Sequence, residues 1–199
     1  MRSKRSFSPC SVVVTRMDGF PKDVSSLIGE FAALQGRTVL WMHLGPSTGS
    51  SIDFHFSPRI RREVPLRNSI LSDDARHYRG EYGLFIHCAW RFVLANGYVR
   101  LGSSDLWQEG DFTVAQSIAT TIEGQAIHHV DVGSLRLDCT IVLESGDSIE
   151  VLCDRGIDCS DDYDVFVPTG VYSISRGQVA FDSTIQKFTP PGYVPGEST

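Results

Sequence analysis

The chain has 199 residues, of which 41% are hydrophobic and 21% are charged, and its formal net charge is −6. This length and composition are typical of a globular protein with one or two compact domains. No apolar run approaches the roughly 20 residues of a membrane-spanning helix, so we expect no transmembrane segment. The basic start holds a run of only three valines, which is too short for a signal-peptide core. We therefore expect a flexible leader over residues 1–20 and a cytoplasmic protein.

The charge is unevenly distributed along the chain. Residues 1–100 contain 14 Lys and Arg against 8 Asp and Glu, a balance of +6, whereas residues 101–199 contain 4 against 16, a balance of −12. Two interpretations are open: the halves complement each other within the fold, or they present surfaces of opposite charge to partners.

The first predicted elements are a helix and two strands. From Pro21 to Gly36, apolar residues recur at helical spacing, and the glycine suits the end of the helix. The segment RTVLWMHLG (37–45) changes to a period of two and predicts a strand. The segment SIDFHFS (51–57) also alternates, with Asp53 and His55 on the face opposite the apolar residues.

The middle of the chain predicts a long connection and then a hairpin. Residues 58–83 are polar, basic and weakly periodic, so we expect a connection with at most one short strand or helical turn. Residues 84–103 are apolar around Asn96-Gly97, a strong two-residue hairpin signal. We expect residues 104–110 to form a loop.

The last part of the chain predicts a helix and several strands. A helix is expected over 111–122, followed by a three-strand meander over 125–153 with turns near Gly133 and at Ser145 to Asp147. Two further strands are expected, in YDVFVP and VYSIS. The Pro- and Gly-rich end, residues 186–199, predicts a flexible tail.

Two stretches of the chain resemble each other at an offset of 88 residues. LQGRTVLWMHLG (34–45) matches IEGQAIHHVDVG (122–133) at its glycines and apolar positions, and each stretch follows a predicted helix. Further on, WRFVLANGYV (90–99) resembles YDVFVPTGVY (163–172). We interpret this as a duplication, with halves at 21–110 and 111–185. The expected fold is α+β and mainly antiparallel β, with the two sheets either packed face to face or joined in one barrel-like sheet.

The histidines and cysteines do not predict a metal or catalytic site. His129 and Asp131 share a strand face, but two ligands are incomplete for zinc, and His43 joins them only if the two strands pair. The five cysteines are odd in number and form no CxxC pair, which favours reduced thiols. His87 and Cys88 are neighbours on a predicted strand, so they point apart and cannot form a dyad. We expect no catalytic residue, no metal and no cofactor.

Two charged clusters are the candidate binding sites. The first is an acidic loop suited to a basic protein partner; it comprises Asp154, Asp158, Asp161, Asp162 and Asp164. The second is a basic set suited to an anionic ligand such as a nucleotide or sugar phosphate, bound between the halves; it comprises Arg59, Arg61, Arg62, Arg67, His87 and Arg91. We expect no nucleic-acid binding, because no aromatic side chains are interleaved with the arginines and the chain is acidic overall.

The motifs L-x-G-x-x-V at 34–39, IHCAWR at 86–91 and GD-x-I-x-V at 146–151 resemble small bacterial β-rich proteins of unknown function. Some proteins of that kind are similar to immunity proteins of toxin systems. The resemblance covers about residues 30–183, and it implies a cytoplasmic, non-enzymatic binding protein.

The leading functional hypothesis is therefore a protein-interaction module, of an immunity or defence type, that binds a basic partner through its acidic half. The alternative is a binding protein or enzyme for a small anionic ligand that uses the Arg/His set.

Overall fold

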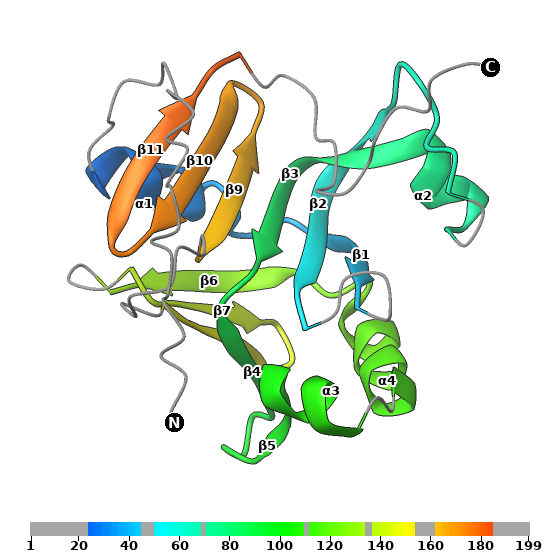
Figure 1. Ribbon diagram of the computed structural model, residues 1–199, viewed down its shortest axis with the longest axis vertical. Coiled ribbons are helices and arrows are strands. Elements are labelled where there is room, and N and C mark those ends of the chain that lie inside the picture. The colour runs from blue at the N-terminus through cyan, green and yellow to red at the C-terminus, as the bar shows by residue number, and fades with distance from the viewer. Residues whose placement is uncertain are drawn as a thin grey trace, which may run out of the picture.

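The computed structural model of the 199-residue chain describes residues 24–44, 50–68, 71–109, 112–133, 137–153 and 162–184. The predicted leader, residues 1–20, and the predicted tail, residues 186–199, lie outside these ranges. Within the described residues the fold is α+β and mainly antiparallel β, as the sequence predicts (Figure 1).

Six strands form the larger sheet, in the order β1-β2-β3-β9-β10-β11, with antiparallel neighbours throughout. Their bounds are Val39–His43 (β1), Ile52–Arg61 (β2), Tyr78–Ile86 (β3), Tyr163–Val167 (β9), Gly170–Ser175 (β10) and Gln178–Asp182 (β11). The register shifts between Phe56 and Arg59 of β2, which marks a bulge or irregularity in the β2–β3 ladder.

Five strands form the second sheet, which reads β6-β7-β8-β4-β5 from one edge to the other and is also antiparallel. Their bounds are Ala89–Val93 (β4), Val99–Gly102 (β5), Ile127–Val132 (β6), Cys139–Leu143 (β7) and Ser148–Leu152 (β8).

Four helices accompany the strands in the described residues, and their bounds are Val24–Ala32 (α1), Asp73–His77 (α2), Ser103–Glu109 (α3) and Phe112–Ile122 (α4). Helix α1 buries Leu27 and Phe31, and α4 buries Ala115, Ile118 and Ile122, so each turns one apolar face inward. Helix α1 contacts β6, and α4 contacts β1.

The main hydrophobic core is shared by both sheets and by α1, α3 and α4. Because side chains alternate along a strand, the inner face of the larger sheet contributes a row that crosses all six strands. This row comprises Met42, Phe54, Leu84, Val165, Tyr172 and Phe181. The outer face of the same sheet therefore receives the neighbouring residues, including Asp53 and His55.

The sheets exchange strands in a regular way. In each order, a meander of three consecutive strands is followed by strands from elsewhere in the chain: β1-β2-β3 by the meander β9-β10-β11, and β6-β7-β8 by the hairpin β4-β5. The chain thus passes from the larger sheet to the smaller one between β3 and β4, and returns between β8 and β9.

Hydrogen bonds between the two similar stretches obey the 88-residue offset. The N–H of Gly36 donates to Ile127 O at 2.8 Å, and the N–H of Gly124 donates to Val39 O at 2.8 Å. Adding 88 to the residue number of Gly36 gives Gly124, and subtracting 88 from that of Ile127 gives Val39, so the two bonds are equivalent under the offset. A second related pair, both at 2.9 Å, runs from Val39 N to Gln125 O and from Ile127 N to Arg37 O. This pattern is what a duplication predicts, and the duplication itself stays a hypothesis.

The predicted elements need several corrections. Residues 58–83 are not mainly a connection, because β2 continues to Arg61 and β3 begins at Tyr78, with α2 between them. The apolar run over 84–103 is broken at His87-Cys88, where the chain changes sheet. Residues expected as a loop form α3, and β11 was not expected at all. The hairpin at Asn96-Gly97, the helix over 112–122 and the meander β6-β7-β8 are confirmed.

None of the helices in the described ranges is long and apolar enough to cross a membrane.

Candidate functional site

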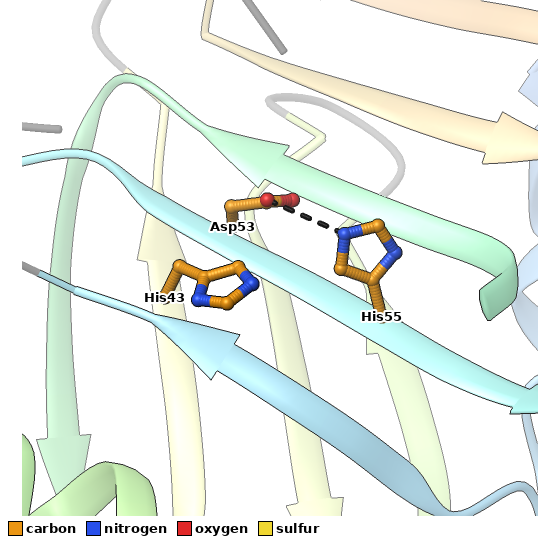
Figure 2. A group of neighbouring side chains, drawn as sticks. All are labelled: His43, Asp53 and His55. Carbon is orange, nitrogen blue, oxygen red and sulfur yellow. Dashed lines mark ion pairs between the residues drawn. The ribbon is translucent and has the colours of Figure 1, made fainter. Parts of the chain in front are cut away.

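The outer face of the larger sheet brings two histidines and an aspartate together at its β1–β2 edge. His43 on β1 lies directly opposite Asp53 on β2, and Trp41 lies opposite His55. Since residues two apart on a strand share a face, His43, Asp53 and His55 project from the same side of the sheet. Figure 2 shows the three side chains together above β1 and β2.

The three side chains are spaced slightly more widely than the ligands of a bound metal ion. The Nε2 of His55 is 3.4 Å from the Oδ2 of Asp53, and one ligand atom from each of the three residues lies within 4.8 Å of the others. Four-coordinate zinc, with bonds of about 2.0–2.2 Å, holds its ligand atoms roughly 3.3–3.6 Å apart. The Asp53–His55 pair already has this separation, which is long for a hydrogen bond. The other ligand separations, which are at most 4.8 Å, have to close by no more than about 1.5 Å to fit the same geometry.

Asp53 has an unsatisfied oxygen. Its side chain is 5% exposed, and Oδ1 is the only buried side-chain nitrogen or oxygen found without a hydrogen-bond partner in the described residues. Leaving such an acceptor buried and unpaired costs about 1–3 kcal/mol, and more for a charged group. The site therefore favours a cation or a hydrogen-bond donor against Oδ1.

His55 is held from its other ring nitrogen. The backbone N–H of Gly80 donates to Nδ1 at 3.2 Å, so without a metal the ring proton belongs on Nε2, directed at Asp53. Gly80 lies opposite Arg59, next to the register shift in the β2–β3 ladder. A metal on Nε2 moves the proton to Nδ1 and breaks the Gly80 contact. That loss costs about 1–3 kcal/mol and weakens the binding of an ion by the same amount.

Burial leaves His43 uncharged at neutral pH. Burial lowers the pKa of His43 and outweighs the opposing effect of Asp53, so the imidazole keeps a lone pair for a metal. Burial also lowers the pKa of Arg62, to about 10, which still leaves its guanidinium charged at neutral pH. The Nε of Arg62 donates to Tyr78 O at 2.9 Å and to Ala75 O at 3.3 Å. Arg62 therefore supplies a fixed positive charge near Asp53.

Aromatic rings restrain His55 further. The rings of Trp41 and His43 meet the His55 ring edge-on, with centroids 5.8 Å and 6.0 Å away. The ring is thus restrained by two neighbours and by the Gly80 amide, as metal-binding histidines are commonly oriented by their surroundings.

The acidic loop is only partly described. Asp154, Asp158 and Asp161 lie outside the described residues. Asp162 is 2% exposed, and its Oδ2 accepts a hydrogen bond from Arg176 N at 2.9 Å, so it is not on an accessible acidic surface. Asp164 bonds Ser173 Oγ at 2.5 Å and lies 3.3 Å from His87 Nε2. Docking of a basic partner here stays a prediction that rests on the undescribed carboxylates.

The basic set is distributed over both sheets. Arg59, Arg61, Arg62 and Arg67 lie at the end of β2 and just beyond it, close to α2, whereas Arg91 is on β4 at the other end of the molecule (Figure 1). Arg59 pairs with Asp74 at 2.8 Å, and Arg91 pairs with Glu150 at 2.5 Å. His87 faces Asp164. The structure therefore does not bring the six side chains together as one anion site.

The histidine pair considered from the sequence forms a separate, exposed contact. His129 Nε2 is 3.2 Å from Asp131 Oδ2, with both side chains substantially exposed. His43 does not join them, because the bonds between the two stretches lie at residues 36–39 and 124–127, and beyond these β1 pairs with β2 while β6 pairs with β7.

Sequence reasoning missed the site formed by His43, Asp53 and His55. The available signal was the alternation in SIDFHF, which puts Asp53 and His55 on one face, together with a histidine near the end of the preceding strand. The missing step was the pairing of these two strands with a register that sets His43 against Asp53.

Comparison with known proteins gives no assignment, because no protein-family model, curated protein or solved structure matches the chain.

Proposed function

We propose that this chain binds a divalent transition-metal ion, of which Zn²⁺ is the best fit, through His43, Asp53 and His55. The observation that carries the proposal is the buried, unpaired Oδ1 of Asp53 beside two imidazoles. Two nitrogen donors and one carboxylate oxygen form a donor set that suits zinc.

The charge balance supports a site that exchanges its ion. Without metal, Arg62 offsets the carboxylate charge of Asp53; with metal, Arg62 opposes the added positive charge. Three protein ligands leave a fourth position for water or for a group of a bound molecule, as in catalytic zinc sites. The ion is therefore expected to bind more weakly than in a closed four-ligand site.

The interaction-module hypothesis remains as a second proposal, and a metal at this site is compatible with it. Its motivation is still the −12 balance of residues 101–199. For localisation we propose the cytoplasm, because the three cysteines in the described residues are free thiols.

The test is zinc binding by equilibrium dialysis of metal-free protein, with zinc measured by mass spectrometry. Wild type is expected to take up one equivalent, and Asp53→Asn is expected to lose at least about 10–100-fold in affinity, the loss seen when only an outer-shell partner is removed. Binding is expected to weaken as pH falls, since protons compete for the imidazoles.

Two matched controls make the outcome specific. His129→Asn alters the exposed His–Asp pair and should leave zinc binding unchanged, and Cys153→Ser removes a thiol that could bind zinc elsewhere. Circular dichroism of each variant checks the fold. The proposal fails if Asp53→Asn binds zinc as tightly as wild type, or if Cys153→Ser alone abolishes binding.

A further inference from the structure

Two cysteines face each other where the β4–β8 ladder ends. Ala89 pairs with Leu152 and Trp90 pairs with Val151, and Cys88 and Cys153 are the next residues of the two segments beyond the last pair. The Sγ atoms of the two cysteines lie within 4.8 Å of each other. Both are free thiols of intermediate burial.

The backbone around this pair suits a covalent link. The N–H of Cys88 donates to Asp162 O at 3.0 Å, and the N–H of Cys153 donates to Asp138 Oδ1 at 2.7 Å, so neither amide bonds across the pair. Opposed residues without such bonds are the closer kind in antiparallel sheets, with Cα atoms about 4.5 Å apart. That separation lies within the range of about 4.4–6.8 Å that disulfides span.

The position in the chain gives the pair its significance. Cys88 lies in the passage from β3 to β4, and Cys153 begins the passage from β8 to β9. Among the described strands these are the two places where the chain changes sheet. A bond between the two sulfurs would therefore tie both passages together.

A metal site explains this cluster less well. Asp162 is the third nearby candidate ligand, but its Oδ2 already accepts a hydrogen bond from Arg176 N at 2.9 Å. The third thiol of the region, Cys139, is 2% exposed, so a small disulfide in solution does not reach it. Cys88 and Cys153 are therefore the two thiols available to react with each other.

We propose that Cys88 and Cys153 form a reversible intramolecular disulfide that ties together the two passages between the sheets, by exchange with a small disulfide such as oxidised glutathione. Cys88 loses its proton and attacks the small disulfide, which releases one small thiol and leaves a mixed disulfide. Cys153 then loses its proton and attacks the Cys88 sulfur, which releases the second small thiol. Two protein thiols are oxidised, and one small disulfide is reduced to two thiols.

The contacts of Cys153 explain this order of attack. Its Sγ donates to Leu137 O at 3.4 Å, and contact with Cys88 together with burial raises the pKa of Cys153. These contacts disfavour attack by Cys153 on a disulfide in solution, so it acts second, when the mixed disulfide is already beside it.

The test uses the full chain, incubated without oxygen in oxidised glutathione, quenched with an alkylating agent and mapped by mass spectrometry. The expected product is a Cys88–Cys153 cross-linked peptide, with an intact mass lower by two hydrogens. The midpoint of thermal unfolding should rise on the order of 10 °C, and dithiothreitol should reverse both changes.

Variants separate this reaction from other thiol chemistry. Cys139→Ser should keep the cross-link, whereas Cys88→Ser should lose the cross-link and the thermal shift. The wild-type peptide map decides the question even if a variant fails to fold. The proposal is overturned if Cys88 and Cys153 stay reduced, carry separate glutathiones, or are cross-linked to Cys10 or Cys159 instead.

Discussion

At the scale of single residues, the contrast between satisfied and unsatisfied buried polar groups singles out the candidate site. The buried carboxylate of Asp162 is bonded at Arg176 N, and the buried ring of His55 is bonded at Gly80 N. Asp53 alone, among the described residues, has a buried side-chain atom left without a partner. The sequence predicted the face on which Asp53 lies, but not its missing partner, because that depends on every neighbour in space.

Tyr163 provides a residue-scale prediction beside the cysteine pair. It is fully buried, and its hydroxyl donates to Leu137 O at 2.8 Å; burial raises the pKa of this phenol, so it remains a donor. Tyr163→Phe should lower the free energy of unfolding by about 1 kcal/mol, measured by urea denaturation. Tyr98→Phe, at a residue that is 66% exposed, is the control and should change nothing measurable. Equal effects of the two changes would contradict the assigned bond.

At the scale of elements, the alternation of apolar and polar residues predicted strands correctly where a strand buries one face. It predicted β1, β2, β6, β7 and β8, because apolar and polar residues alternate along them. It failed at the polar end of the β2–β3 ladder. There Arg59 pairs with Asp74, and its guanidinium lies 3.6 Å from the centre of the Tyr78 ring. These long-range contacts stabilise a polar strand whose composition alone reads as a loop.

Helix α4 offers an element-scale prediction, because it contacts β1, the strand that carries His43. Ile118 is fully buried in the core, whereas Val114 of the same helix is 39% exposed. Ile118→Ala should destabilise the protein by about 2–5 kcal/mol. The matched change Val114→Ala should stay within about 0.5 kcal/mol of wild type in the same urea titration. If the Val114 change were the costlier one, the buried face assigned to α4 would be wrong.

At the scale of the whole molecule, the two similar stretches of the sequence lie against each other in the fold. The matched stretches pair with each other through hydrogen bonds that obey the same offset, and each helix contacts the first strand of the other half. The sequence could not predict that β4-β5 join the smaller sheet and β9-β10-β11 the larger one, because local patterns do not say which sheet a strand joins. The site formed by His43, Asp53 and His55 escaped prediction for the same reason.

The repeat itself makes a whole-molecule prediction. Gly36 and Gly124 both have left-handed backbones, with φ of 76° and 87°, and a Cβ would meet no atom within 4 Å at either. Gly36→Ala and Gly124→Ala should therefore each cost about 1–2 kcal/mol through backbone strain alone. Their costs in thermal or urea unfolding should agree within about 0.5 kcal/mol. A large difference would show that the two positions are not equivalent.

The central claim, a metal ion held by His43, Asp53 and His55, is tested most directly by crystals grown with zinc and measured at the zinc absorption edge. The account predicts an anomalous peak about 2.0–2.2 Å from an imidazole nitrogen of each histidine and from a carboxylate oxygen of Asp53. An anomalous peak found only at Cys88 and Cys153, or no peak at the His43–Asp53–His55 site at saturating zinc, would contradict it.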